Sequence, residues 1–219
     1  ETFGASQLSW GELRHQVSSV AAHLRDMGVA QGDRVVAVLP NTETALIAFL
    51  ASASIGAVWS LCAPDMGHVA ILDRFKQIEP KVLIAQNSYI HAGKTIDRAD
   101  VLDGIAAGLP SLTHRVAVPV AGHTQAGQTP WTELLDHPAP VAPVELPFEH
   151  PLWFVYSSGT TGNPKPIVHG HGGIILESNK QAIHHNLTDT DRFMWFTSSG
   201  WIMWNAQWMG LGQGATVCM

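Results

Sequence analysis

Short apolar segments alternate with helix-like segments along the first 119 residues, and this alternation limits the possible folds more than any other feature of the sequence. The apolar segments are rich in Val, Leu, Ile and Ala, which is typical of strands buried on both faces of a parallel sheet. They span Arg34–Leu39, Ala57–Ala63, Lys81–Gln86 and Arg115–Pro119. Strands that alternate with helices form βαβ units, because a parallel connection needs a crossover. We therefore predict an α/β fold of parallel sheets with helices on both faces.

Helix signals lie before the first of these strands and in the gaps between the first three. Ser9 and Glu12 have the spacing of a capping box, apolar residues follow at helical spacing, and Gly28 marks the end of this first helix. Two further helices are predicted over Glu43–Ile55 and Met66–Ile78.

Seven prolines crowd the region around residues 120–150, where apolar runs are few. We predict a connection there that carries one short helix near Trp131–Leu135. It divides the chain into a first α/β lobe, 1–119, and the start of a second α/β lobe, 151–219, with the Pro-rich connection 120–150 between them. In the second lobe we predict strands at 152–156, 166–170, 192–196 and 215–219, and helices at 172–185 and 204–211.

Charge and cysteine content exclude several classes of function. The chain has 12 Lys and Arg against 18 Asp and Glu, and no run of basic residues, so nucleic-acid binding is not expected. No apolar run approaches the ~18 residues of a membrane span, so no membrane partner is expected. Cys62 and Cys218 lie far apart in apolar surroundings, which favours buried thiols in a reducing, cytoplasmic protein. The expected partners are small molecules.

One stretch between two predicted strands concentrates small hydroxyl residues, glycines and a single lysine. It reads YSSGTTGNPKPIVHGHGG, from Tyr156 to Gly173. Glycines let backbone N–H groups approach an anion, hydroxyls donate to phosphate oxygens, and Lys165 adds a positive charge between two stiffening prolines. A flexible linker is the alternative interpretation. A Walker A loop is excluded, because that motif ends in Gly-Lys-Ser/Thr at the start of a helix and this stretch has neither feature. The pattern favours a cradle for a polyphosphate.

The stretch YSSGTTGNPKPIVH resembles the phosphate-binding signature of the adenylate-forming acyl-CoA synthetases. The usual residue after the lysine is small, and Pro166 departs from that pattern. Residues 8–65 are similar to the opening lobe of this family, and the segments HGHGGIILESNK and DRFMWFTSSGWIMWNAQWMGLGQGATV resemble its acetoacetyl-CoA synthetase branch. The resemblance implies an incomplete N-terminal region of the adenylate-forming fold.

This resemblance also implies a reaction. In the family, a carboxylate attacks the α-phosphate of ATP, pyrophosphate leaves, and the thiol of CoA then displaces AMP to give a thioester. For this chain it implies ATP-dependent conversion of acetoacetate to acetoacetyl-CoA, with ATP, Mg2+ and CoA as cofactors and co-substrates. The C-terminal domain that the family uses is absent from this sequence, so we expect part of a longer chain that is inactive alone.

Site residues follow from the same resemblance. The residues implied to hold the β- and γ-phosphates are Ser157, Ser158, Gly159, Thr160, Thr161, Gly162 and Lys165, with Lys165 as the catalytic cation. The residues implied to line the acyl pocket are Trp201, Ile202, Met203 and Trp204, although Trp201 and Trp204 also fit ordinary core aromatics. Asn205 fits either a hydrogen-bond donor to a 3-oxo group or a helix N-cap.

Several other motifs are interpreted as structural. His169 with His171 and His184 with His185 lack the further ligands of a zinc site, so no metal is predicted. GLGQGA, at 210–215, follows a predicted helix, which is the reverse of a dinucleotide motif, and Asp65 fits a helix N-cap. The alternative functions are another short-chain acyl-CoA synthetase, for acetate, propionate or butyrate, and a non-catalytic nucleotide-binding remnant.

Overall fold

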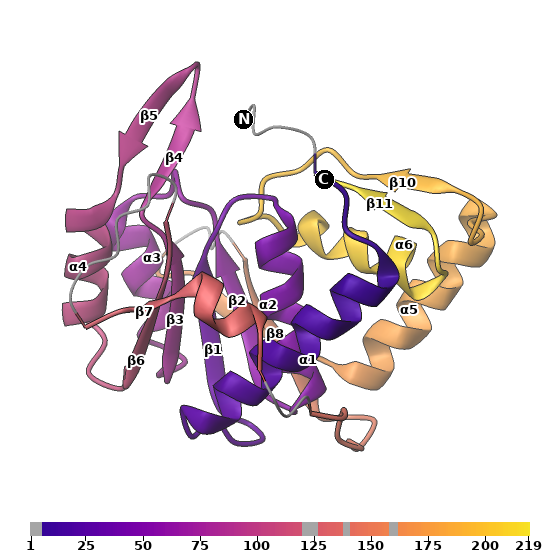
Figure 1. The fold of residues 1–219 in the computed structure, drawn as a ribbon, viewed down its shortest axis with the longest axis horizontal. Helices are drawn as coiled ribbons and strands as arrows, with labels where there is room; N and C mark the ends of the chain where they lie inside the picture. The colour runs from indigo at the N-terminus through magenta and orange to yellow at the C-terminus, as the bar shows by residue number, and fades with distance from the viewer. Residues whose placement is uncertain (1–5, 120–126, 138–140, 158–161) are drawn as a thin grey trace.

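A seven-stranded sheet forms the centre of the computed structural model, which describes residues 6–119, 127–137, 141–157 and 162–219 (Figure 1). The strand order is β7-β6-β3-β1-β2-β8-β9. All neighbouring pairs are parallel except β8 and β9. The strands are β1 Arg34–Val38, β2 Val58–Cys62, β3 Val82–Gln86, β6 His114–Val118, β7 Thr129–Pro130, β8 Pro151–Ser157 and β9 Lys165–Gly170.

Helices cover both faces of this sheet, which confirms the predicted fold class. Along β1, Val35 and Ala37 belong to a core cluster with helices α1 (Trp10–Asp26) and α2 (Glu43–Ser54). The alternate residues, Val36 and Val38, belong to a second cluster on the opposite face. That cluster includes helices α3 (His68–Phe75) and α4 (Ala99–Ala107). Successive side chains of a strand point to opposite faces, so a continuous apolar run serves both cores.

The start of α1 follows its sequence signal. The Ser9 hydroxyl accepts a hydrogen bond from the Glu12 backbone N–H at 3.2 Å, and the Glu12 carboxylate accepts one from the Ser9 N–H at 2.8 Å. The helix ends before Gly28, whose φ of +77° is in the left-handed region. No helix in the described part of the chain is long and apolar enough to cross a membrane.

Two predicted helices have different bounds in the structure. The helix expected over 66–78 is only α3, and its N-cap is Gly67 rather than Asp65, because the Met66 N–H bonds to the Ala63 carbonyl in a preceding turn. The helix expected over 204–211 begins earlier, as the 3-10 helix η2 (Ile202–Ala206), and continues as α6 (Gln207–Gly212).

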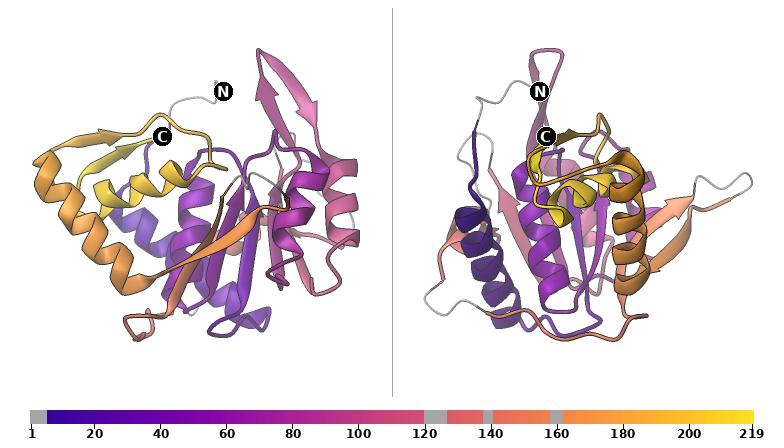
Figure 2. Two further views of the ribbon diagram at one scale, coloured as in Figure 1. Left: turned by 180° about the vertical axis from the view of Figure 1, so that it is seen from behind. Right: turned by 90° about the vertical axis from the view of Figure 1, so that its right-hand side faces the viewer.

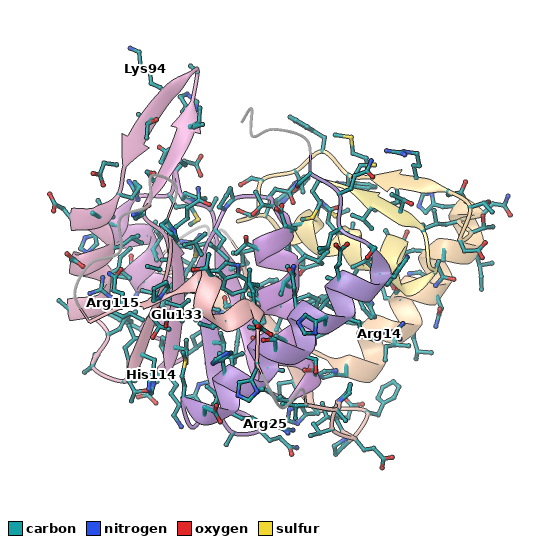
Figure 3. The ribbon with its side chains drawn as sticks, in the orientation of Figure 1. Arg14, Arg25, Lys94, His114, Arg115 and Glu133 are labelled. Atoms are coloured by element: carbon teal, nitrogen blue, oxygen red, sulfur yellow. The ribbon has the colours of Figure 1, made fainter. Side chains whose placement is uncertain are left out.

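An antiparallel hairpin and the helix after it were not predicted. The hairpin consists of β4 (Ser88–His91) and β5 (Lys94–Asp97), and it projects from the body of the molecule with Lys94 near its tip (Figure 3). Its two-residue turn has a φ of +48° at Ala92 and +75° at Gly93. Turns of this kind usually carry Asn-Gly or Asp-Gly. Alanine in the first position removes the signal that sequence reading depends on.

The described part of the Pro-rich connection packs against helix α1. Its short helix, η1 (Trp131–Leu135), is a 3-10 helix in which Trp131 and Leu134 are buried. The Ser19 hydroxyl of α1 donates to the Leu134 carbonyl at 2.7 Å in a buried position. The predicted helix near these residues is therefore present and fixed to α1.

The large sheet continues across the predicted boundary between the lobes. β8 pairs with β2, and β9 extends the same sheet at its edge (Figure 2). A second, small sheet starts only later, where β10 (Arg192–Met194) pairs in parallel with β11 (Thr216–Cys218). Helix α5 (His171–His185) and α6 pack together beside it. The division into lobes stays a prediction, but the structure puts the first two strands after residue 150 in the first sheet.

Close packing of α6 on the small sheet explains one glycine of GLGQGA. A Cβ added to Gly210 would lie 2.9 Å from Phe193 Cβ and 2.9 Å from Val217 Cγ2. We expect Gly210→Ala to lower the free energy of unfolding by about 1–3 kcal/mol, because the added carbon overpacks this contact. Urea unfolding measures the change.

Gly212 provides the matched control, because it lies in the same helix and its added Cβ has no neighbour closer than 3.5 Å. We expect Gly212→Ala to be neutral or slightly stabilising. Equal losses in the two variants would contradict the packing explanation.

Candidate active site

A cavity of about 310 Å3 lies where the carboxyl ends of β2 and β8 meet the segment before α6. Ligands of parallel α/β sheets commonly bind outside the carboxyl ends of the strands. The cavity is lined by predicted pocket residues Trp201, Ile202 and Trp204, and by Leu61, Arg74, Tyr156, Ser199, Gly200, Asn205, Trp59 and the β8 residues 153–155. Met203 is half-buried and lies outside this lining.

Ser199 and Gly200 hold the predicted acyl segment against the strand ends. The buried Ser199 hydroxyl donates to the Leu39 carbonyl, just after β1, at 2.5 Å. A Cβ added to Gly200 would lie 3.0 Å from the Ala63 backbone nitrogen, just after β2, so the chain can approach this closely only without a side chain. The next residue, Trp201, reaches the cavity and is 56% exposed.

Trp204 serves the core as well as the cavity. It is 2% exposed, its Nε1 donates to Asn41 Oδ1 at 2.9 Å, and its ring meets Phe49 edge-on at 6.2 Å. The sequence left open whether Trp204 is a wall of the acyl pocket or an ordinary core aromatic, and the structure gives it both environments. Trp201 has the free surface that a substrate-facing wall requires, whereas Trp204 has very little.

Asn205 lines the cavity without capping a helix. The residue at the N-cap of η2 is Trp201, and the one at the N-cap of α6 is Ala206. The capping role expected of Asn205 is therefore wrong. Its Nδ2 donates to the Ile202 carbonyl at 3.0 Å, which keeps the side chain beside the acyl segment.

The ends of the predicted phosphate loop are brought together by antiparallel pairing. Ser157, at the end of β8, lies opposite Lys165, at the start of β9. Gly162 and Lys165 are exposed. Four of the predicted loop residues, Ser158, Gly159, Thr160 and Thr161, lie outside the described residues. The assignment of the loop to phosphate stays a prediction, with its two ends side by side at the edge of the sheet.

Helix α3 and the turn that follows it contact both ends of this loop. On the leading side, the Tyr156 hydroxyl donates to the Arg74 carbonyl at 2.8 Å, and the Arg74 guanidinium lies 5.6 Å from the centre of the Tyr156 ring. On the trailing side, Gln77 Nε2 donates to the Pro164 carbonyl at 2.8 Å. Burial raises the pKa of Tyr156, so its hydroxyl keeps the proton that it donates.

Sequence reasoning missed the roles of Arg74 and Gln77, because their contacts join positions 82 and 87 residues apart. Arg74 is also the basic residue that lines the cavity, and no local pattern marks it. A strand-to-helix contact of this kind has no signal in a single sequence.

Of the histidines considered from sequence, His169 and His171 are half-buried, whereas His184 and His185 are exposed. His169 Nδ1 accepts a hydrogen bond from Trp153 Nε1 at 2.8 Å, which occupies one of its two possible ligand atoms. Burial, together with the nearby His150, lowers the pKa of His171. Both cysteines are free; burial raises the pKa of the Cys62 thiol to about 12, whereas Cys218 is only half-buried. The expectation of a buried thiol is thus correct for Cys62 alone.

Comparisons with known proteins find a matching family model and relatives that agree with one another. A family model described as AMP-binding enzyme matches residues 2–219. The acetoacetyl-coenzyme A synthetase of Rhizobium meliloti (strain 1021) is 43% identical, with 97% of this chain and 34% of that protein covered. The acetoacetyl-CoA synthetase of Rattus norvegicus is 39% identical, with 98% and 34% covered.

A solved structure agrees with these matches. The acetoacetyl-CoA synthetase from Streptomyces lividans superimposes with a TM-score of 0.94 at 45% identity, covering 97% of this chain and 33% of that one. The chain spans about a third of the length of these relatives. The superposition confirms the predicted adenylate-forming fold. Because the family model covers the chain from its second residue to its last, the chain belongs to the family of AMP-binding enzymes.

Proposed function

We propose that this chain is the N-terminal region of an acetoacetate–CoA ligase that forms AMP. The observation that carries the proposal is the cavity, which joins the acyl segment at Trp201 and Ile202 to Tyr156, the residue that leads into the predicted phosphate loop. An acid in this space lies next to the place where the phosphates of ATP are expected. The identity to several acetoacetyl-CoA synthetases supports acetoacetate as the acid.

The first half-reaction is a substitution at the α-phosphorus. An oxygen of the acetoacetate carboxylate attacks, the bond to the β-phosphate breaks, and the electron pair leaves with pyrophosphate. Two anions must meet, so charge neutralisation and in-line placement matter more than a nucleophilic side chain. We assign the loop from Ser157 to Lys165 to the leaving pyrophosphate, with Lys165 as the cation that compensates its charge.

In the second half-reaction, the CoA thiolate attacks the acyl carbon and AMP leaves. Mg2+ bound to the phosphate oxygens of ATP would neutralise part of their charge. None of the described residues that line the cavity is a carboxylate, so the phosphates themselves are the ligands that fit this ion.

The C-terminal domain of the complete protein is the expected partner for the thioester step. We place the protein in the cytoplasm, where both free thiols would stay reduced.

Acid-dependent exchange of pyrophosphate into ATP by the complete protein tests the proposed function. Exchange with acetoacetate at a higher kcat/KM than with acetate, propionate or butyrate is the expected result. Faster exchange with one of those acids would assign the protein to another short-chain synthetase. No exchange with any of them would favour a non-catalytic remnant.

Malonamate is an informative additional acid. A Malonamoyl-CoA synthetase vrtB from Penicillium aethiopicum is 33% identical over 97% of this chain. Malonamate and acetoacetate both carry a carbonyl group at the third carbon. If the cavity recognises that carbonyl, malonamate should be activated better than butyrate, which has the same length as acetoacetate and no such group.

Ile202 is expected to limit the length of the acid, because it is a branched side chain in the lining of the cavity. We expect Ile202→Ala to raise kcat/KM for hexanoate relative to acetoacetate by about tenfold, since a few methylene groups in an apolar pocket contribute differences of that order. Steady-state kinetics with both acids provide the measurement. Val69→Ala is the control, because Val69 is 67% exposed and lies outside the lining. A similar change of acid preference in Val69→Ala would contradict the role of Ile202 in limiting the length of the acid.

A further inference from the structure

Three side chains with metal-ligating atoms meet on the surface of α1, away from the cavity. They are His23, Asp26 and His137, and one ligand atom of each lies within 4.8 Å of the others. His23 and Asp26 are three positions apart in α1, so they share one face of the helix. His137 follows η1, and its Nε2 lies 3.0 Å from Asp26 Oδ2. The ring centres of His23 and His137 are 4.7 Å apart, edge to face.

The hydrogen bonding of the two histidines suits metal binding. His23 Nε2 lies 3.3 Å from the backbone carbonyl of Asp136. A carbonyl can only accept, so Nε2 carries the hydrogen and Nδ1 keeps the lone pair. In many metal sites, a backbone carbonyl that accepts from the other ring nitrogen fixes the tautomer of a ligating histidine. Between His137 and Asp26 the shared hydrogen occupies the place that a cation takes when both groups become ligands.

The elements that carry the cluster are fixed to each other. The Ser19 hydroxyl bonds to the Leu134 carbonyl, and Leu134 is fully buried between η1 and the core. Figure 3 labels Arg25, which lies between the two α1 ligands in sequence, and Glu133, which lies on η1. The side chain of His137 is 14% exposed and that of Asp26 is 69% exposed. One side of the cluster is thus held by packed structure and the other is open to water.

We propose that His23, Asp26 and His137 bind one Zn2+ ion, with water completing its coordination. Two imidazole nitrogens and one carboxylate oxygen are ligands that zinc accepts, whereas Mg2+ and Ca2+ prefer oxygen alone. The ion would tie the end of α1 to the segment after η1. No local spacing reveals this site, because His137 lies 111 residues from Asp26. The site is separate from the proposed ligase reaction.

Zinc titration of the complete, chelator-treated protein tests the site directly. Isothermal titration with ZnCl2 should give one tight equivalent, and MgCl2 should give none at the same concentrations. We expect His137→Ala and His23→Ala each to weaken zinc binding at least tenfold. Asp26→Asn, which keeps the shape of the side chain but removes the charge, should also weaken it.

His15→Ala is the matched control, since His15 lies on the same helix and its Nε2 is 3.8 Å from a carboxylate oxygen of Asp136 outside the cluster. It should bind zinc as the unchanged protein does. Thermal unfolding adds a readout independent of activity: zinc should raise the melting temperature of the unchanged protein and of His15→Ala but not of His137→Ala. The proposal would be overturned if His137→Ala bound zinc as tightly as the unchanged protein. It would also be overturned if zinc binding were lost on replacement of the exposed His184 and His185 instead.

Discussion

Replacing Lys165 with alanine is expected to slow acetoacetate-dependent ATP–pyrophosphate exchange by the complete protein about 100-fold or more. Lys165 is the one lysine of the predicted loop, at the start of β9 and opposite Ser157. Negative charge develops on the leaving pyrophosphate, and removal of a single preorganised donor to such a group costs about 100- to 1000-fold in rate. Initial rates of exchange at saturating acetoacetate measure the loss.

The pattern of the kinetic constants distinguishes this role from simple binding of ATP. If Lys165 acts mainly on the leaving group, kcat should fall more than the KM for ATP rises. Lys180→Ala provides the control, because Lys180 lies on α5 in an exposed pair with Glu177. An unchanged exchange rate in Lys165→Ala would remove the lysine from the reaction, even if the protein proved to be a ligase.

Replacing Phe75 with alanine should lower the free energy of unfolding by about 3–5 kcal/mol, as large-to-small changes of buried aromatic residues do. Phe75 is fully buried where α3 packs on the sheet, in the cluster that also contains Val36 and Val38. The lost stability has two parts, which are the favourable free energy of burying the ring and the cost of the cavity that its removal leaves. Urea unfolding followed by tryptophan fluorescence measures it.

Phe196→Ala is the control for this change, because Phe196 is 92% exposed. We expect it to change the free energy of unfolding by no more than about 0.5 kcal/mol. A loss below about 1 kcal/mol in Phe75→Ala would mean that the site can collapse around the smaller side chain, and that α3 is held less by its core face than its burial suggests.

The strands of the central sheet could be predicted because their signals are local. A strand such as Arg34–Val38, with its apolar run 35–38, is visible without any partner, and so is the capping box of Ser9 and Glu12. The same reasoning failed at the turn of Ala92 and Gly93, where the backbone adopts a conformation that the alanine does not signal. Helix bounds near Met66 were wrong because a turn competes with the first residues of the helix.

Some residues of the candidate site could be predicted from the sequence, and others depend on packing that no local signal reveals. The acyl segment was located through resemblance, and the structure places Trp201, Ile202 and Trp204 around one cavity. The roles of Arg74 and Gln77 could not be predicted, because they depend on how α3 sits relative to β8 and β9. The sequence of α3 alone indicates an amphipathic helix. Only the packing places Arg74, near the end of α3, and Gln77, just after it, beside the ends of the loop.

The contacts that α3 and the turn after it make with the loop ends have a consequence for amide hydrogen exchange. Phe75 fixes the helix to the core, and the hydrogen bond between Tyr156 and Arg74 fixes one loop end to the helix. The hydrogen bond from Gln77 to Pro164 fixes the other loop end to the turn after the helix. These elements should therefore open as one cooperative unit. Nucleotide that binds at the loop should slow exchange of the amides in α3, even in residues that it does not touch, and Phe75→Ala should weaken nucleotide binding through the same linkage.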